Sequence, residues 1–476
     1  MKHTVQSLVR AALLLGLCLA MLAGCTVVRQ TVTTTTSTSS TATSTLTTPP
    51  SETLTAEELA ELLLSGAEAA EGTKSSVTDW ILSWGFDGFW DDKLLAVEQV
   101  YDYYYVGDIP DHLTVARTLV SLFCEYLLAD TDLSDVDDVT DAFITCYLEA
   151  VGDKYAYYMD RESYASYSSD VSGVYEGIGV SAVFDSTLGG IEVVSVFEGS
   201  PAEEAGLLVG DVIVAVEGNT VRELGYYEAI DRIRGEAGTY VRITVSRGGE
   251  ELDFTCQRRQ VTEETVVWRM QTDRIGYVRI STFSEVTAAQ FKTAVDQLVS
   301  LGAESLVFDL RSNSGGLLSS ILEILDYLLA DGYPLANYFY YDGSTDADLG
   351  GDGHSVDLPF AVLCNAYTAS AAELFTSALK DYDEKGLADA TVVGTRTYGK
   401  GMMQTLIAFV DDTAMTVSIA YYQPPYSPNY EGVGVLPHHT VHLAEGLENV
   451  NVGKLTPEED TQLAKAVELL EETDGR

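Results

Sequence analysis

The segment from Phe360 to Glu373 places the strongest constraint on how this chain can fold. Its apolar run Phe360–Cys364 is typical of a buried strand, and apolar residues at helical spacing after a short turn predict a helix that begins near Ser370. A hydroxyl at such a strand-to-helix corner lies beside the free N–H groups and the positive dipole end of the helix. Because those N–H groups can stabilise an oxyanion, Ser370 is a candidate nucleophile.

The same residues also fit a purely structural role, because Ser370-x-x-Glu373 is a capping box, a pattern that marks many helix starts. A second segment favours catalysis. Residues 397–404 read Thr-Tyr-Gly-Lys-Gly-Met-Met-Gln, which places Lys400 between two glycines and ends at Gln404. Together with Thr-Ala-Ser-Ala-Ala-Glu around Ser370, this segment resembles the active-site motifs of the carboxyl-terminal processing peptidases, the tail-specific Ser/Lys proteases of family S41.

The resemblance implies a serine endopeptidase in which Ser370 attacks the scissile carbonyl, neutral Lys400 acts as general base and Gln404 orients Lys400 by a hydrogen bond. The N–H groups of Gly316 and Ala371 would form the oxyanion hole. Neither a metal nor a cofactor is needed. A free lysine has a pKa of about 10.4, so a useful base at pH 7 requires a depression of roughly three units. Lys400 is therefore expected to be buried, with no carboxylate paired to it.

From about residue 261 the pattern becomes α/β. Strands are predicted at 276–280 and 305–310, with a helix at 287–298 between them. The second strand leads into residues 311–316, which read Arg-Ser-Asn-Ser-Gly-Gly, and then into an amphipathic helix to Leu329. This segment resembles the family's Asp-Leu-Arg-x-Asn-Pro-Gly-Gly, with serine in place of proline. A dinucleotide fingerprint would need a third glycine, which is absent.

Two successive strand–loop–helix units imply parallel strands whose loops meet at the same sheet edge. That arrangement should bring Gly315 and Gly316 into one crevice with Ser370. Another short strand, 391–394, precedes Lys400, which can approach from the same side.

Residues 172–260 predict a small β-rich domain. The run Tyr-Glu-Gly-Ile-Gly-Val at 175–180 is followed in order by Gly-Ser-Pro-Ala-x-x-Ala-Gly, Val-Gly-Asp-Val-Ile-x-x-Val and Arg-Gly-x-x-Gly-Thr. This ordered set resembles a PDZ domain. A helix near 226–233 would form a wall of its pocket. Backbone N–H groups of one loop would hold a substrate's C-terminal carboxylate while the peptide adds a strand to the sheet edge: Gly177, Ile178, Gly179 and Val180.

The first residues have the pattern of a targeting segment, 1–24. Lys2 and Arg10 form a basic region, and the apolar run Ala11–Gly24 is too short to span a bilayer. The run ends in Leu-Ala-Gly-Cys, which resembles a bacterial lipobox and predicts a lipid anchor on Cys25, outside the cytoplasm on the outer face of a bacterial cell membrane. A plain secretory peptide with a chance cysteine is the alternative. Residues 25–55 are Thr/Ser-rich and predict a flexible tether.

The charge of the chain excludes some partners. It has 73 acidic against 27 basic residues, a net charge of −46. Such a surface argues against electrostatic binding of nucleic acid or anionic lipid. The expected partners are protein or peptide substrates bound by their C-termini, and the membrane through the anchor.

The predicted architecture is therefore multidomain α+β. A helical region at 56–170 precedes the PDZ domain, and within it residues 151–159 resemble the family's signature, with Lys154 where proline is usual. The resemblance implies that 261–445 form an α/β peptidase core of crotonase- or ClpP-like type. A tail at 446–476 reads as one helix from about residue 456. The N-terminal helices and the tail helix could both form a homodimer interface.

Several polar clusters leave alternatives open. Cys124 and Cys146, in neighbouring predicted helices, could form a disulfide outside the cytoplasm or remain buried thiols. Asp130, Asp132, Ser134, Asp138 and Asp141 follow calcium-loop spacing, but Asp135 stands where the sharp turn needs glycine, and Ser134 also fits a helix N-cap.

The histidines His438, His439 and His442 raise a Ser/His arrangement or a metal site as rivals to Ser/Lys. A histidine trio after proline at a strand start is more often structural, so Ser/Lys is preferred. The family usually has aspartate at position 438, and its serine-to-lysine spacing is shorter, so residues 381–388 are expected to bulge as a surface loop. A non-catalytic PDZ peptide-binding scaffold is the alternative function. A crotonase-like acyl-CoA enzyme is disfavoured, because nothing basic is arranged for a nucleotide.

Overall fold

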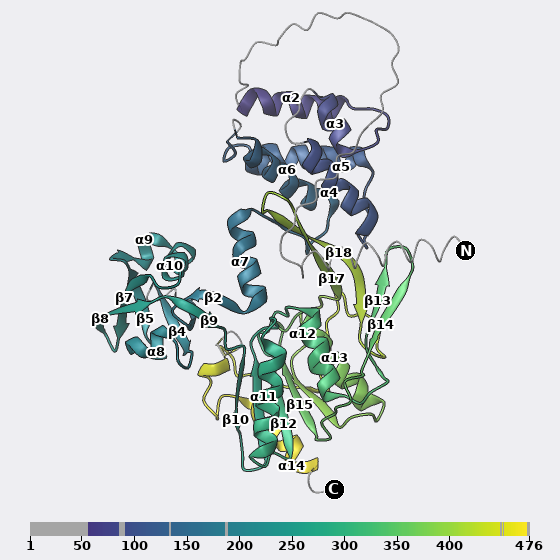
Figure 1. Ribbon diagram of the computed structural model, residues 1–476. Helices are drawn as coiled ribbons and strands as arrows, with labels where there is room; N and C mark the ends of the chain where they lie inside the picture. Colours follow the sequence, from purple (N-terminus) through teal and green to yellow (C-terminus); the bar gives the residue numbers. More distant parts are fainter. Residues whose placement is uncertain are drawn as a thin grey trace, which may run out of the picture. The chain divides into compact units, whose positions relative to one another are not determined.

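The computed structural model describes residues 56–84, 91–132, 135–185, 189–447, 450 and 452–473 (Figure 1). The predicted targeting segment, the lipidation residue Cys25 and the tether lie outside the described residues. None of the described helices has both the length and the apolar character that a membrane crossing requires.

A six-stranded sheet forms the centre of the C-terminal half. In spatial order its strands are β10 (Val266–Met270), β11 (Ile275–Ile280), β12 (Ser305–Asp309), β15 (Phe360–Cys364), β16 (Ala390–Gly394) and β19 (His439–Thr440). All pairs are parallel except β10 with β11. Strands β12 and β15 are buried along their whole length, as expected for continuous apolar strands covered on both faces. The predicted parallel arrangement is confirmed.

Helices cover both faces of this sheet. Leu306 and Phe308 of β12 belong to the core that contains helices α11 (Thr287–Ser300), α12 (Leu318–Leu328) and α13 (Ala371–Glu384). Side chains alternate along a strand, so Val307 faces the other side, where it packs with helix α14 (Thr461–Thr473). The predicted tail helix is confirmed. The apolar residues of helix α14 pack in this core. Its apolar face is therefore not available for the homodimer interface that the sequence suggested.

Helix α13 corrects one expectation. The predicted surface loop at 381–388 is wrong in its first half, because the helix continues to Glu384 and Asp381 is buried. The Asp381 carboxylate accepts the N–H groups of Tyr426 and Ser427, both at 2.7 Å. Residues 381–384, which were expected to lie in a loop, therefore extend helix α13. The helix can continue here because two backbone N–H groups satisfy the buried Asp381 carboxylate.

A second sheet links the C-terminal half to the N-terminal helices. Its strands are β1 (Tyr158–Met159), β18 (Ala414–Gln423), β13 (Pro334–Tyr340) and β14 (Thr345–Leu349), with β17 (Met402–Ala408) also paired to β18. Met415 and Val417 of β18 are buried in the core of the helical region. The predicted domain boundary at residue 170 divides the chain only in sequence. In space, the core of the helical region also contains residues of strand β18.

The N-terminal region is helical, as predicted. Its helices are α2 (Ala56–Ala69), α3 (Val77–Ser83), α4 (Asp91–Tyr104), α5 (His112–Leu122), the π-helical turn η1 (Phe123–Leu127), α6 (Val136–Val151) and α7 (Arg161–Ser172). Helix α6 begins one residue later than a Ser134 cap would require, and Asp135 caps it by accepting the N–H groups of Asp137 and Asp138. The Ser134 N-cap is therefore wrong, and Ser134 itself lies outside the described residues.

The structure bears on two questions that the sequence left open in the helical region: a calcium loop at residues 130–141 and a disulfide between Cys124 and Cys146. Asp141, the last ligand of the calcium-type spacing, accepts the Tyr158 hydroxyl at 2.5 Å through Oδ1, and the same oxygen lies 3.4 Å from Lys93 Nζ. Cys124 and Cys146 are free thiols, and burial raises the pKa of Cys146 to about 12. The buried-thiol interpretation is the one that the structure supports.

Residues 174–262 contain the predicted β-rich domain. Strand order in its main sheet is β3 (Val180–Asp185), β4 (Gly190–Val196), β5 (Val212–Val216), β7 (Tyr240–Arg247) and β8 (Glu250–Gln257), with β6 (Asn219–Thr220) beside β5. Its helices are α8 (Pro201–Ala205), α9 (Val221–Leu224) and α10 (Tyr226–Ile233). Strand β2 (Val174–Gly177) pairs with β9 (Arg259–Thr262). The domain has its own apolar core.

Candidate active site

Ser370 occupies the corner between strand β15 and helix α13. Its backbone has φ = 56° and ψ = −124°, in a region that residues with a side chain rarely adopt. Holding a serine there costs about 1–3 kcal/mol, and such strain concentrates at functional sites. A strained strand-to-helix turn is also how hydrolases expose a nucleophilic serine. The predicted corner is confirmed, with a backbone conformation that favours function over a simple cap.

Glu373 is the centre of the polar contacts around this corner. Its side chain is fully buried. Oε2 accepts the N–H groups of Ser370 at 2.9 Å and Lys400 at 2.8 Å, and Oε1 accepts the N–H of Gly399 at 2.7 Å and the hydroxyl of Thr397 at 2.5 Å. Burial raises the pKa of Glu373, while these hydrogen bonds oppose the rise. One carboxylate thus ties the backbone of the candidate nucleophile to that of the candidate base.

Lys400 is half-buried, so the burial expected from the sequence is met only in part, and it has no carboxylate partner among the described residues. Its Nζ lies 4.9 Å from the centroid of the Tyr155 ring, and no carboxylate oxygen of the described residues lies within 4.0 Å of it. Burial lowers the pKa of the amine, and the more distant Glu431, Asp153 and Glu373 oppose this only in part. The amine therefore loses its proton more readily than a lysine in water.

Tyr422 of strand β18 also joins the two segments. Its hydroxyl donates to the carbonyl oxygen of Lys400 at 2.7 Å and lies 3.4 Å from Ser370 Oγ. The hydroxyl of Tyr430 lies 3.3 Å from the carbonyl oxygen of Ser370. Ser370 Oγ and Lys400 Nζ have no direct hydrogen bond to each other among the described side chains. Their segments meet through Glu373 and Tyr422, neither of which the sequence assigned to the site.

The glycine pair lies against the nucleophile, as predicted. A Cβ at Gly315 would lie 2.8 Å from Ser370 Cβ and 3.0 Å from Ala371 N, and a Cβ at Gly316 would lie 2.2 Å from the Phe283 carbonyl oxygen. Only glycine fits at both positions. Within the described part of the chain, the N–H groups of Gly316 and Ala371 donate no hydrogen bond. They are free to bind an oxyanion.

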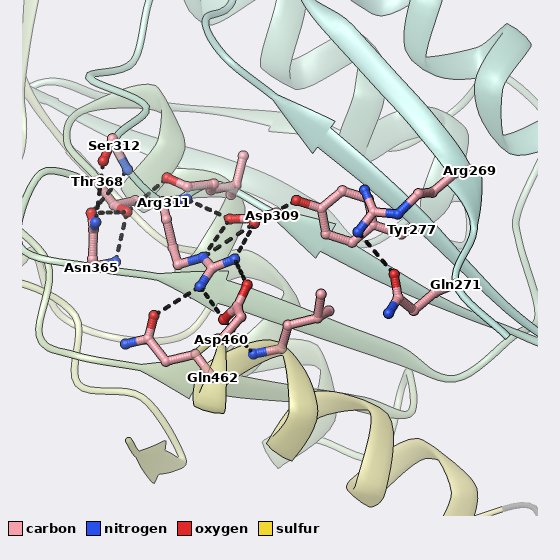
Figure 2. Close-up of polar contacts among 12 residues, drawn as sticks. Arg269, Gln271, Tyr277, Asp309, Arg311, Ser312, Asn365, Thr368, Asp460 and Gln462 are labelled. Carbon is pink, nitrogen blue, oxygen red and sulfur yellow. Dashed lines mark hydrogen bonds and ion pairs between the residues drawn. The ribbon is translucent and has the colours of Figure 1, made fainter. Parts of the chain in front are cut away.

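Side-chain hydrogen bonds hold the glycine loop to the nucleophile loop (Figure 2). Asn365 Oδ1 accepts the N–H of Ser312 at 2.9 Å, and the Thr368 hydroxyl donates to the Leu310 carbonyl oxygen at 2.8 Å. Because both loops follow neighbouring parallel strands, these contacts fix their relative position at the sheet edge.

A buried ionic network around Arg311 holds the start of the glycine loop (Figure 2). The fully buried Arg311 contacts Asp309 at 2.6 Å and Asp460 at 2.7 Å, and Gln462 at 3.1 Å. Burial would raise the pKa of Asp309, but Arg311 outweighs it and lowers that pKa. The loop that precedes the glycines is thus anchored to the start of the tail helix.

Gln404 does not make its predicted contact. It lies on β17 at a register shift between residues 403 and 404, and its Nε2 donates to the Met402 carbonyl oxygen at 3.0 Å and to Ser418 Oγ at 3.2 Å. No hydrogen bond joins it to Lys400 within the described residues. The role of Gln404 in orienting Lys400 stays a prediction.

The histidine cluster has structural contacts. His438 Nδ1 accepts the N–H of Val392 at 3.1 Å, its Nε2 lies 3.9 Å from Glu384, and burial lowers its pKa. His439 forms part of strand β19. Among the described residues, no hydrogen bond or ion pair links His438 to Ser370, so the structural interpretation of this cluster fits best.

One group of carboxylates could hold a metal ion by geometry alone. Oxygen atoms of Asp326, Asp331 and Asp352 lie within 4.8 Å of one another. They belong to helix α12 and to loops after it, and Asp326 already accepts the N–H of Gly351 at 2.6 Å. The proposed chemistry at Ser370 does not use them.

The predicted peptide-binding loop opens into a pocket of about 230 Å³. Gly177, Ile178, Gly179 and Val180 all line it, together with Tyr226 and Ile230 of helix α10. Strand β3 is the end strand of its sheet and, among the described strands, pairs with β4 alone, so its other edge has no strand partner there. An open edge beside such a loop is the geometry that strand addition of a peptide requires.

Comparisons with known proteins agree with this division. Residues 274–441 match the model of peptidase family S41, and residues 192–247 match that of the PDZ domain. The carboxy-terminal processing protease CtpA of Bacillus subtilis (strain 168) is 33% identical over 288 residues, which cover 60% of each chain. A "Probable CtpA-like serine protease" of Staphylococcus aureus (strain COL) is 29% identical over 394 residues, or 81% of this chain and 77% of the relative.

A solved structure has a similar fold. A candidate S41 protease from Bacteroides fragilis NCTC 9343 aligns with a TM-score of 0.53 at 16% identity, covering 82% of this chain and 98% of that one. Residues 274–441 are thus similar to the peptidase domain of family S41, and residues 192–247 are similar to a PDZ domain. The alignment spans about 60% of the length of the Bacillus relative.

Proposed function

We propose that this chain, which combines a family S41 peptidase domain with a PDZ domain, is a serine endopeptidase that processes protein C-termini with a Ser370/Lys400 dyad. One observation carries the proposal. The buried Glu373 carboxylate holds the backbone of both residues, with Ser370 strained at a helix start and the Lys400 amine free of any ion pair.

In the proposed reaction, Ser370 Oγ attacks the scissile carbonyl while neutral Lys400 takes its proton. The N–H groups of Gly316 and Ala371 donate to the oxyanion. Collapse of the tetrahedral intermediate releases the amine, which receives the proton from Lys400. Water then attacks the acyl-enzyme, again with Lys400 as base, and frees the acid. Gln404 would orient the Lys400 amine once substrate is bound.

We further propose that the PDZ domain captures the substrate by its C-terminal carboxylate. The pocket beside Gly177–Val180 and the open edge of β3 support this, as do relatives whose names describe carboxy-terminal processing. The central parallel sheet supports a crotonase- or ClpP-like type for the peptidase core.

The site of action is part of the same proposal. The basic start and the lipobox-like sequence before Cys25 favour an extracytoplasmic enzyme, lipid-anchored to the outer face of a bacterial cell membrane. A Cys25→Ser variant should appear in the soluble fraction, whereas the wild type should partition with membranes. Equal partitioning of both would contradict the anchor.

Cleavage of a tagged unstructured peptide tests the catalytic assignment. Wild-type protein should cleave it, while Ser370→Ala and Lys400→Ala should be inactive and His438→Ala should retain activity. Equal cleavage by wild type and Ser370→Ala would reject the proposed nucleophile. An inactive histidine variant beside an active lysine variant would replace Ser/Lys by Ser/His.

A further inference from the structure

Lys154 lies next to the active site although it belongs to the short segment between helix α6 and strand β1. Its Nζ lies 2.5 Å from Oε1 of Glu431, with 60% of the Lys154 side chain and 18% of the Glu431 side chain exposed.

Glu431 reaches the catalytic segment through its other contacts. Its Oε2 accepts the N–H of Gly401, the residue directly after Lys400, at 2.7 Å. Its Oε1 accepts the Tyr155 hydroxyl at 2.8 Å in addition to Lys154. Both carboxylate oxygens therefore have donors, and Lys154 is the charged one.

The Tyr155 ring contacts both lysines. Lys154 Nζ lies 4.6 Å from the ring centroid, and Lys400 Nζ lies 4.9 Å from it. The aromatic residue that follows Lys154 in the sequence therefore lies beside the Lys400 amine.

We propose that Lys154 is a positioning residue of the peptidase: it neutralises Glu431, and so removes the carboxylate charge that would otherwise hold a proton on the Lys400 amine. The inference rests on the proposed function of Lys400 as the general base. It adds to that function a cation outside the motifs that define the dyad.

The charges around Lys400 agree with this role. Burial lowers the pKa of Lys400, and three carboxylates oppose it in the order Glu431, Asp153 and Glu373. Among the described residues, Lys154 is the one cation that forms an ion pair with any of these three. The other titratable groups that face Lys154 and Glu431 are tyrosines whose pKa values burial raises, so that they stay neutral at pH 7: Tyr105, Tyr155, Tyr422 and Tyr430.

The test is the pH dependence of kcat/KM for peptide cleavage by wild type and Lys154→Gln. The base must be neutral, so the rate rises with pH through the pKa of Lys400. Loss of the Lys154 charge should raise that pKa and move the acid limb up by about 0.5–1 pH unit. The rate at pH 7 should then fall about three- to tenfold, while the plateau at high pH is unchanged.

Two control variants separate charge from packing. Lys154→Arg keeps the cation and should restore the wild-type profile. Lys292→Gln removes another lysine–glutamate ion pair, 2.8 Å from Glu323, and should leave the profile unmoved because Lys292 lies on helix α11, outside the site. An equal loss of rate at every pH would assign Lys154 a structural role, and an unmoved acid limb would overturn the proposal.

The proposal can fail independently of the proposed function. If Ser370→Ala cleaves as well as wild type, the function is wrong. The protonation of Lys400 can then still be followed in the folded protein by its acetylation with acetic anhydride as a function of pH, quantified by mass spectrometry. Lys154→Gln should shift the Lys400 labelling curve to higher pH, and identical curves would reject the inference.

Discussion

At the scale of single residues, the backbone of Ser370 is the most unusual feature of the site. Its φ of 56° is costly for a residue with a Cβ, by about 1–3 kcal/mol, whereas glycine adopts positive φ freely. We predict that Ser370→Gly is more stable than Ser370→Ala by about 1 kcal/mol, because alanine keeps the Cβ that causes the strain. Urea unfolding of the two variants measures the difference, and equal stability would show that the corner is not strained.

Glu373 is the second residue with a specific expectation. In Glu373→Gln one carboxylate oxygen becomes an NH₂ group that faces backbone donors, so hydrogen bonds to the Ser370 or Lys400 segment are lost. Hydrogen bonds to a charged group contribute about 1.5–3 kcal/mol each, so kcat/KM should fall about ten- to a hundredfold.

The matched control for this change is Glu384→Gln, on the same helix with an exposed side chain, whose partners are Lys380 at 3.7 Å and His438 at 3.9 Å. Both variants should unfold cooperatively. If Glu373→Gln keeps activity within twofold of wild type, the hydrogen bonds of Glu373 to the Ser370 and Lys400 segments are not needed for catalysis.

At the scale of elements, the contact between the tail helix and the glycine loop has the clearest energetic consequence. In Asp460→Ala, Arg311 keeps Asp309 but loses one of its two buried carboxylates. Breaking a buried pair costs about 3–5 kcal/mol, so we predict a loss of unfolding free energy near the lower end of that range. Glu468→Ala, which removes an exposed pair on the same helix, is the control and should change stability by less than about 1 kcal/mol.

The same network predicts how stability depends on pH. The pKa of Asp309 is lower in the folded protein than in the unfolded chain, because Arg311 stabilises the carboxylate. The Asp309–Arg311 interaction therefore adds its full amount to the free energy of unfolding above the unfolded pKa of about 3.9, and this amount is lost as pH falls further. Urea unfolding of the wild type should therefore show this stabilisation unchanged above about pH 4 and declining below it, and a free energy of unfolding that does not fall in acid would contradict the prediction.

The elements that carry the site were predictable because each has a local signature. The continuous apolar runs of β12 and β15 identify buried parallel strands, and their loops then meet at one edge with Gly315 and Ser370 together. Local patterns were less informative where a side chain has a distant partner. Asp381 looked like loop but is satisfied by the backbone at 426 and 427, so the helix continues past it.

At the scale of the whole molecule, the site draws on segments far apart in the sequence. Tyr155 comes from the end of the helical region, Tyr422 from strand β18 and Glu431 from the loop after it. None has a local pattern that distinguishes it from an ordinary core or surface residue. Motif spacing therefore located Ser370 and Lys400, whereas the groups that set the charge and position of Lys400 needed the structure.

The PDZ domain gives a prediction at this scale. If it holds substrates by their carboxylate, amidation of a peptide's C-terminus should lower kcat/KM at least tenfold, because the loop N–H groups lose their anionic partner. The comparison uses two peptides identical except for the terminal amide, each incubated with the same enzyme. Equal rates would mean that Gly177–Val180 do not bind the carboxylate.

The central claim is that the Lys400 amine is neutral near physiological pH while its segment is held to that of Ser370. The pKa of Lys400 measures this directly, by competitive acetylation and mass spectrometry of the folded Ser370→Ala protein across pH. The account predicts that burial lowers the pKa of Lys400, so that its amine titrates at a lower pH than every exposed lysine of the same chain. A Lys400 that titrates with the exposed lysines, near pH 10.4, would contradict it.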